Sequence, residues 1–293
     1  MHWQTARYRL DLTRPKVMGI VNVTPDSFSD GGCHASTRAA LAHCETLLAE
    51  GAHILDIGGE SSRPGTPPVP LEEERARVLP VLREAVAMGV PVSVDTYKPQ
   101  IMKEALDLGA DIINDIWGFR QPGAIEAVAV HPSCGLCVMH MHGEPQTMQR
   151  APLQGDAVPQ VRSFLASASA ALQEAGVGRE RIAWDPGIGF GKTVEQNYAL
   201  LARQRALLAG YPLLVGWSRK SSLGHVTGLP VNERAAPSLA AAVLAVERGA
   251  HVVRVHDVKQ TIAALKVLCA MRAMNVESER SERSERSEGE LKP

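Results

Sequence analysis

Residues 181–192 read RIAWDPGIGFGK, and this stretch shows the architecture of the chain most clearly. A short apolar segment runs directly into Asp185, and a proline and three glycines follow within six residues. Proline interrupts the hydrogen-bond ladder of a strand, and glycine allows a sharp turn or the close approach of a ligand. The stretch therefore predicts a strand that ends in an acid, followed by a turn. That turn either forms a pocket floor or needs its glycines for steric reasons alone. Its GxGxGK pattern lacks the GxxxxGK[ST] spacing of an ATP-type phosphate loop.

The pattern of a strand followed by a helix recurs eight times along the chain. Strands are expected at residues 16–22, 53–57, 92–94, 111–113, 136–139, 182–184, 213–217 and 252–255. Helices are expected at residues 36–50, 71–88, 124–130, 158–175, 194–209, 233–248 and 258–274, with one more from residue 99. Continuous Val, Ile and Leu strands that alternate with amphipathic helices predict a parallel sheet covered on its faces. Eight such units predict a single (β/α)8 TIM barrel. Residues 7–13 are expected to close the bottom of this barrel. A doubly wound sheet is the alternative, but the first strand lacks the GxGxxG turn of a dinucleotide fold.

Two connections and the end of the chain depart from the regular pattern. The connections after the first two strands, residues 22–37 and 58–70, are long, because such connections usually have about 2–6 residues. The end of the chain, ESERSERSERSEGELKP, has almost no apolar content, so burial cannot offset its ordering entropy. We therefore expect a catalytic domain over residues 1–275 and a disordered tail over residues 276–293. A short charged helix is the alternative for the tail.

The composition argues against several classes of protein. The 293 residues are 45% hydrophobic and carry a net charge of −1, which gives no reason to expect a nucleic acid or an anionic membrane as a partner. No apolar run approaches the roughly 20 residues of a membrane span, and the first residues lack the apolar core of a signal peptide. Five cysteines without framework spacing favour reduced thiols, and we expect a cytoplasmic protein. Cys134 and Cys137 form a CxxC in a strand expected to be buried, which favours a core role over a redox or zinc role.

A polar side chain stands at the end of every predicted strand. These residues are Asn22, Asp56 with Glu60, Asp95, Asn114 with Asp115, His140 with His142, Asp185, Lys220, and Arg254 with His256. Any one of them could be a helix cap or a turn former. Eight in succession instead predict a functional face at the carboxyl ends of the strands, where barrel enzymes carry their active sites.

The chemistry of this set suits an aromatic heterocycle that carries an anionic group. The carboxylates of Asp95 and Asp185, the amide of Asn114 and the ammonium of Lys220 match amino, ring N–H and carbonyl edges, as in a pterin or a purine. The sequence shows no Ser-His-Asp order and no Cys-His pair, which argues against a covalent hydrolase.

An anion site is predicted beside the heterocycle site. Arg254 and His256 are two residues apart on a strand, so both point to one face, and with Arg63 they would hold a phosphate or diphosphate. No His and carboxylate cluster has the spacing of a transition-metal site. Mg²⁺ needs only a few protein oxygens beside substrate phosphates, and Asn22 could supply one.

Eight stretches, taken together, resemble bacterial dihydropteroate synthase. They are GIVNVTPDSFSDGG (19–32), DIGGESSRPG (56–65), SVDTYKP (93–99), INDIWG (113–118), VMHMHGEPQTMQ (138–149), DPGIGFGK (185–192), VGWSRKS (215–221) and RVHDV (254–258). The match covers residues 16–270 in order. The first two stretches are long enough that chance agreement is negligible, whereas the last alone would be weak.

The resemblance implies a TIM-barrel transferase of folate biosynthesis. Such an enzyme condenses 6-hydroxymethyl-7,8-dihydropterin diphosphate with 4-aminobenzoate and releases diphosphate and 7,8-dihydropteroate by an SN1-like mechanism. The resemblance also implies assistance by Mg²⁺, inhibition by sulfonamides that mimic 4-aminobenzoate, loops that close on substrate, and a homodimer.

The resemblance further implies a role for each residue that matches the family's motifs. The pterin would be held by Asp95, Asn114, Asp185 and Lys220. The diphosphate would lie against Asn22, Arg63, Arg254 and His256, with Asn22 as the Mg²⁺ ligand. The 4-aminobenzoate would lie near Ser62, Arg63, Phe190, Lys220 and Ser221. The implied catalytic residues are Asp95, Asp185, Lys220, Arg254 and His256.

Two residues depart from the pattern, and two other functions compete with the synthase. Ser62 stands where threonine is usual. Trp217 stands where a smaller aliphatic residue is expected, so it either packs against the helices or intrudes on the pocket. A pterin-binding methyltransferase would not need the diphosphate loops, which are present here. A non-catalytic paralogue would be expected to lose Arg63, Lys220 or His256, and all three are present.

Overall fold

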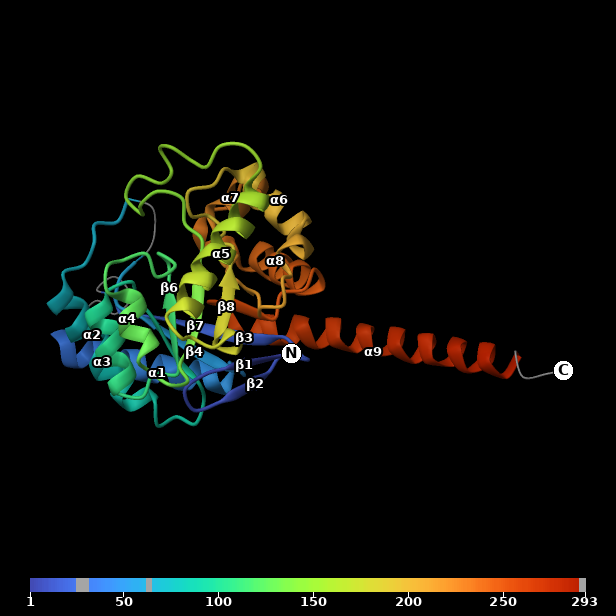
Figure 1. The fold of residues 1–293 in the computed structure, drawn as a ribbon, viewed down its shortest axis with the longest axis horizontal. Coiled ribbons are helices and arrows are strands. Elements are labelled where there is room, and N and C mark those ends of the chain that lie inside the picture. The colour runs from blue at the N-terminus through green and yellow to red at the C-terminus, as the bar shows by residue number, and fades with distance from the viewer. Residues whose placement is uncertain (25–31, 62–64, 290–293) are drawn as a thin grey trace.

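Eight parallel strands form the centre of the molecule, and helices surround them (Figure 1). The computed structural model describes residues 1–24, 32–61 and 65–289. In the order of the sheet, the strands are β8 (Ile182–Asp185), β7 (Gly135–Met139), β6 (Ile112–Asp115), β5 (Val92–Asp95), β4 (Ile54–Gly58), β3 (Lys16–Asn22), β10 (Val252–Val255) and β9 (Leu214–Val215). A parallel bridge between Trp184 and Leu213 joins the two ends of this order. The prediction of a (β/α)8 TIM barrel is confirmed.

The helices occupy the predicted places with small changes at their ends. They are α1 (Gly32–Ala49), α2 (Leu71–Ala85), α3 (Pro99–Asp107), α4 (Ala124–Ala129), α5 (Ala157–Glu174), α6 (Val194–Ala202), α7 (Ser221–Thr227), α8 (Ala235–Glu247) and α9 (Val258–Gly289). The helix predicted at 194–209 ends at Ala202, and a 3₁₀ turn at Gln204–Leu207 follows it. Helix α7 was not predicted. It is short and ends at Gly228, whose φ of 73° is the left-handed conformation typical of a helix end.

The strands form because almost every one of their residues is buried on one side or the other. A large apolar cluster lies between the sheet and the helices and includes Val21, Ile57, Val94, Ile113 and Val138, all at most 2% exposed. Parallel strands covered on both faces need such continuous apolar runs. The register places Asp95 opposite both Gly58 and Asn114, so the polar ends of β5 and β6 lie next to each other.

A two-stranded hairpin closes the bottom of the barrel. Its strands are β1 (His2–Gln4) and β2 (Arg9–Asp11), which pair antiparallel. Trp3 is 0% exposed in an apolar cluster with Met18, Ile54 and Leu214, and its indole N–H donates to the carbonyl of Arg181 at 2.8 Å. Leu12 and Leu10, from the segment 7–13 that was predicted to close the barrel, also belong to this cluster, whereas Trp3 precedes that segment. The hairpin itself was not predicted, and it begins earlier than the predicted segment.

Helix α9 projects well beyond the barrel (Figure 1). The sequence predicted that this helix ends at residue 274 and that a disordered tail follows. The structure instead continues the helix to Gly289, which matches the charged-helix alternative for most of the tail. Glu and Arg have high helix propensity, so local preference extends a helix that the apolar pattern alone would end. Among the described residues, no helix is long and apolar enough to cross a membrane.

The catalytic unit is expected to work without the tail. We expect that deletion of every residue after Asn275 leaves kcat unchanged and the Tm within a few degrees of that of the full chain. The reason is that the tail has almost no apolar side chains with which to stabilise the barrel. Steady-state kinetics and a thermal melt of the two proteins test this, and a large drop in either quantity would show that the tail is structural.

Candidate active site

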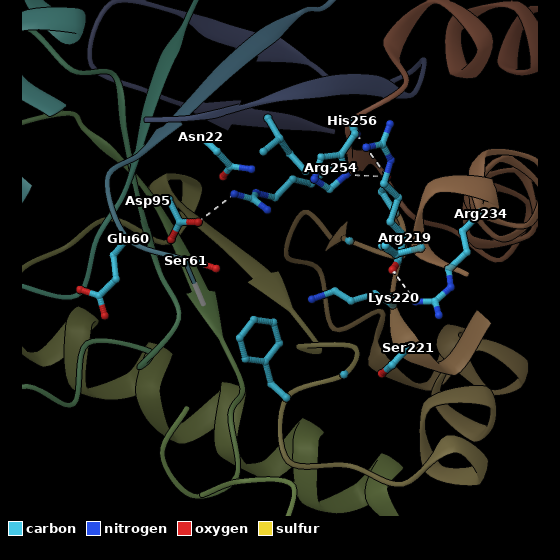
Figure 2. A pocket seen from close by; sticks show the side chains of 16 residues that line it. Asn22, Glu60, Ser61, Asp95, Arg219, Lys220, Ser221, Arg234, Arg254 and His256 are labelled. Carbon is cyan, nitrogen blue, oxygen red and sulfur yellow. Dashed lines mark hydrogen bonds and ion pairs between the residues drawn. The ribbon is translucent and has the colours of Figure 1, made fainter. Parts of the chain in front are cut away.

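The carboxyl ends of the strands surround a cavity of about 390 Å³ (Figure 2). Seven residues predicted for the site line it, namely Asn22, Asp95, Phe190, Lys220, Ser221, Arg254 and His256. Figure 2 shows Asp95 and Arg254 pointing towards each other, with Asn22 close by and Lys220 reaching in from the other side. These seven residues therefore gather around one opening at the carboxyl ends of the strands.

A deeper pocket adjoins this cavity and contains the whole predicted heterocycle set. Its lining includes Asp95, Asn114, Asp185 and Lys220. Ile116, Met139 and Ile188 add apolar walls. Asp95, Phe190, Gly216, Lys220 and Arg254 line both spaces, so the two are continuous. Taken together, the apolar walls and converging polar groups of the two continuous spaces suit a flat ring with polar edges.

Two polar acceptors in the barrel interior lack partners. Asn114 is 3% exposed and donates from Nδ2 to Asp56 Oδ2 at 3.3 Å. Asn114 Oδ1 and Asp56 Oδ1 have no hydrogen-bond partner among the described residues. Buried polar atoms are almost always hydrogen-bonded, so these two acceptors indicate a place for the N–H groups of a ligand or for water.

Arg254 holds two carboxylates together across the barrel. Its Nε lies 2.6 Å from Asp56 Oδ2, and its Nη2 lies 2.8 Å from Asp95 Oδ2. Asp56 is 0% exposed, and this guanidinium lies directly against its buried carboxyl group. Burial raises the pKa of Asp95, and the nearby guanidinium opposes that rise. Besides the predicted role at an anion site, Arg254 therefore forms ion pairs with two acidic side chains, Asp56 and Asp95.

Asp185 ends β8 and lies on the floor of the deep pocket. Burial raises the pKa of its carboxyl to about 6, against the lowering effects of the Gly187 N–H and of Lys220. That N–H donates to Asp185 Oδ1 at 2.7 Å. The carboxylate therefore has a fixed orientation and is ionised at neutral pH, where it can accept hydrogen bonds from amino and ring N–H groups.

Lys220 and Phe190 form the wall between the two spaces. The Lys220 ammonium lies 4.2 Å from the centroid of the Phe190 ring, which is a cation–π arrangement. Burial, together with the charge of Arg254, lowers the pKa of Lys220 to about 8. Ser221 lines the outer cavity beside them as the first residue of α7.

His256 is a neutral hydrogen-bonding group rather than a cation. Burial lowers its pKa to about 3, and the charges of Arg219 and Arg254 add to this effect. Its Nδ1 lies 2.9 Å from Ser218 Oγ, and its main-chain N–H donates to the same oxygen at 3.2 Å. The pairing of cation and imidazole predicted here therefore consists of a charged Arg254 and an uncharged His256.

Trp217 packs away from the cavity. Its side chain is 2% exposed, and its ring lies 5.3 Å from that of Tyr198 on α6. It is absent from the lining of both spaces. The open choice between helix packing and intrusion is thus decided in favour of packing. Ser62 and Arg63 lie outside the described residues.

The residues that could hold a metal ion are few. Within residues 1–24, 32–61 and 65–289, no three His, Cys, Asp or Glu side chains gather into a metal-binding group. The described residues therefore supply no ready-made cage for a metal ion. Asn22 offers one amide at the wall of the outer cavity, which fits an ion that takes its other ligands from a diphosphate and water. Cys134 and Cys137 are free and 0% exposed, in agreement with the predicted core role.

Several residues of the site had no predicted role. Glu60, Ser218, Arg219 and Arg234 line the outer cavity. Arg219 has a φ of 59°, an uncommon value for a residue other than glycine, and its Nη2 lies 2.7 Å from Asp257 Oδ1. Arg219 directly precedes the predicted Lys220 in the SRK stretch, and this neighbour was the signal that could have pointed to it. Asp56 was recognised only as a strand end.

Comparison with known proteins places this geometry in one family. The family model described as "Pterin binding enzyme" matches residues 18–256. The dihydropteroate synthase of Neisseria meningitidis serogroup B is 51% identical over 272 residues, which cover 90% of this chain and 95% of that protein.

Two solved structures share the fold at high identity. The dihydropteroate synthase of Burkholderia cenocepacia, complexed with 7,8-dihydropteroate, is 54% identical with a TM-score of 0.87, covering 94% of this chain and 98% of that one. The dihydropteroate synthase of Yersinia pestis, in a sulfonamide drug complex, is 44% identical with a TM-score of 0.88. The match covers 93% of this chain and 100% of that one.

Proposed function

The chain belongs to the dihydropteroate synthases among the pterin-binding enzymes, and on that basis we propose that it joins 6-hydroxymethyl-7,8-dihydropterin diphosphate to 4-aminobenzoate. The products are 7,8-dihydropteroate and diphosphate. One observation carries the assignment of the site: the deep pocket lined by Asp95, Asn114, Asp185 and Lys220 opens into the cavity that holds Arg254 and His256. The pterin ring would lie in the first space and the diphosphate in the second.

The residues of the deep pocket would bind the pterin and favour its electron-deficient form. Asp185 and Asn114 offer acceptors to amino and ring N–H groups, and Lys220 offers a donor to the ring carbonyl. The carboxylates of Asp95 and Asp185 would also stabilise positive charge as it develops on the ring. Ile116 and Met139 would exclude water from its faces.

Departure of diphosphate is the difficult step in this reaction. An aromatic amine is already a neutral nucleophile at pH 7, so a strong general base is unnecessary. The C–O bond to the diphosphate would break first and leave a cationic exocyclic methylene that the dihydropterin stabilises. Arg254 and His256 would hold the departing group, one by charge and the other by hydrogen bonding. Mg²⁺, bound by Asn22 and the diphosphate, would neutralise the negative charge of the leaving group.

The 4-aminobenzoate would occupy the outer part of the cavity. Phe190 provides an apolar surface for its ring, while Lys220 and Ser221 provide donors for its carboxylate. Ser62 and Arg63 are proposed for the same subsite. Attack of the amine nitrogen on the methylene carbon forms the new C–N bond, and the nitrogen then loses a proton. Water must be excluded until then, because it would capture the same cation.

A coupled assay tests the proposed reaction. Diphosphate release from the pterin diphosphate with Mg²⁺ should depend on added 4-aminobenzoate, because the amine consumes the cation. Release at the same rate without the amine would show hydrolysis and contradict the proposal. A pterin-dependent methyl transfer without diphosphate release would favour the methyltransferase.

His256→Ala is expected to act on the diphosphate and spare the pterin. The loss of one hydrogen-bonding group should weaken binding of the pterin diphosphate by about ten- to a hundredfold, in line with about 1.5–3 kcal/mol for a bond to a charged group. Binding of 6-hydroxymethyl-7,8-dihydropterin should remain within about twofold of wild type, because this ligand lacks the diphosphate to which His256 would hydrogen-bond. Isothermal titration with both ligands measures this. An equal loss for the two ligands would contradict the assignment.

We also propose that the enzyme is a cytoplasmic homodimer that uses helix α9 as its contact. Val267, Met271 and Met274 are 71%, 48% and 59% exposed, and their spacing places them on one face of α9. An exposed apolar stripe suits a second copy of the chain. Sedimentation velocity should give twice the mass of the chain, and Met271→Glu should shift it to the monomer. A wild-type monomer at micromolar concentration would contradict the proposal.

A further inference from the structure

Lys192, the last residue of the glycine-rich stretch, is buried beneath it. The residue is 2% exposed. Its ammonium donates to three main-chain carbonyls, those of Gly187 at 2.8 Å, Phe190 at 3.1 Å and His140 at 3.3 Å. An ammonium has three hydrogens, so these bonds can use all of them. A cation buried in this way costs free energy, and the bonds to carbonyls must offset that cost.

The three carbonyls belong to two neighbouring loops. His140 follows β7, while Gly187 and Phe190 lie in the turn that follows β8. The two backbones touch, because a Cβ on Gly187 would overlap the carbonyl oxygen of His140. Gly187 also has a φ of 65°, which L side chains rarely adopt. The Lys192 ammonium therefore fastens the glycine-rich turn to the end of β7.

Two groups of the proposed site depend on the position of this turn. The Gly187 N–H donates to Asp185 Oδ1 at 2.7 Å and so orients the carboxylate. The Phe190 ring lines both cavities and lies against the Lys220 ammonium. The main-chain carbonyls of Gly187 and Phe190 both accept hydrogen bonds from the Lys192 ammonium. The backbone of Lys192 itself is held by helix α6, since Thr193 and Gln196 form a capping box directly after it.

The charge of Lys192 acts on the same carboxylate. Burial lowers the pKa of Lys192 to about 7, and Asp185 opposes this change. In return, Lys192 lowers the pKa of Asp185 together with Lys220 and Arg254. The remaining titratable groups that face Asp185 are Asp95 in the same pocket and Cys137 on β7. Lys192 thus favours the ionised form of the acid whose orientation it secures.

We propose that Lys192 is the positioning residue of the pterin subsite: its ammonium seats the turn on β7 and keeps Asp185 oriented and ionised for the ring. This inference rests on the proposed function, because it assigns Asp185 to the pterin. Lys192 lines neither cavity, so it would act through Asp185 and Phe190 without touching substrate.

The pH dependence of pterin binding tests the proposal. The probe is 6-hydroxymethyl-7,8-dihydropterin without phosphates, titrated calorimetrically from pH 5 to 8.5. Wild-type binding should weaken as pH falls through about 6, because protonation of Asp185 removes an acceptor. In Lys192→Met the midpoint should rise by about one pH unit, because a nearby positive charge shifts a carboxyl by that order. Lys192→Arg keeps the charge and should keep the wild-type midpoint.

Each outcome has a defined meaning. The exposed Lys103→Met on α3 is the matched control and should leave the midpoint unchanged. A wild-type midpoint in Lys192→Met, or the same upward shift in Lys192→Arg, would overturn the inference. If Lys192→Met does not fold, Lys192→Gln takes its place, and failure of both to fold would assign Lys192 to overall folding and overturn the inference. If the wild type does not bind the pterin at all, the proposed function itself fails.

Discussion

Asp185→Asn is expected to weaken binding of the dihydropterin by about ten- to a hundredfold while leaving the fold intact. A hydrogen bond to a charged group contributes about 1.5–3 kcal/mol, and 1.4 kcal/mol corresponds to a factor of ten in affinity. The amide retains one acceptor for the Gly187 N–H but presents its NH₂ to a ring edge that itself donates. Calorimetric titration with 6-hydroxymethyl-7,8-dihydropterin at pH 7.5 measures the loss.

The melting temperature separates this effect from a loss of structure. Burial raises the pKa of Asp185 to about 6, so the ionised carboxyl is disfavoured in the folded protein. A neutral amide removes that cost at neutral pH, so we expect the Tm to be equal to or above that of the wild type. The exposed Asp107→Asn serves as the matched control and should change neither quantity. Unchanged affinity in Asp185→Asn would remove this residue from the pterin subsite.

Arg254→Met is expected to have the largest effect on stability. The change leaves Asp56, which is 0% exposed, and its neighbour Asp95 without their shared cation. Removal of one partner from a buried ion pair typically lowers the free energy of unfolding by about 3–5 kcal/mol. Urea unfolding at pH 8 measures the loss. The exposed Arg205→Met is the control for the loss of a positive charge and should change stability little.

The loss in Arg254→Met should become smaller as the pH falls. Without the guanidinium, the pKa of the buried Asp95 rises further above its value in the unfolded chain. A carboxyl whose pKa is raised by folding stabilises the fold below its unfolded pKa, and that contribution is lost as pH rises through the folded pKa. The deficit in unfolding free energy should therefore be larger at pH 8 than at pH 5. A deficit independent of pH would show that packing, rather than unpaired charge, causes it.

The sequence predicted the strand ends correctly because they follow from local patterns. A short, mostly apolar run of three residues that stops at Asp95 or Asp185 marks a strand and its polar end at once. The barrel then brings such ends together without further information, and the two acids do line one pocket. The topology was predictable for the same reason, since eight similar units allow few alternatives.

The sequence did not predict the contacts that depend on how the barrel closes. Arg254 and Asp56 are 198 residues apart in the chain, and they meet because β3 pairs with β10 on one side and with β4 on the other. Arg254 was therefore predicted to face a ligand, while its two carboxylate partners were missed. The burial of Lys192 was missed as well, because a lysine after a glycine-rich turn looks like an exposed residue until the turn packs on β7.

At the end of α9, the apolar pattern predicted less structure than the chain forms. The apolar pattern ends near Met274, and without apolar side chains the prediction was a disordered tail. Helix propensity, which acts without tertiary contacts, instead continues the helix to Gly289. Trp217 was ambiguous because its direction depends on Tyr198, a residue of another helix.

Conversion of labelled 4-aminobenzoate is the most direct test of the central claim, that the two adjoining cavities form one synthase site. The wild type should convert radiolabelled 4-aminobenzoate into labelled 7,8-dihydropteroate in the presence of the pterin diphosphate and Mg²⁺, with one diphosphate released for each product formed. Asp185→Asn should need more pterin diphosphate to reach half of its maximal rate. If the wild type binds the pterin but forms no labelled product, the account is wrong, and the chain is a pterin-binding protein of another kind.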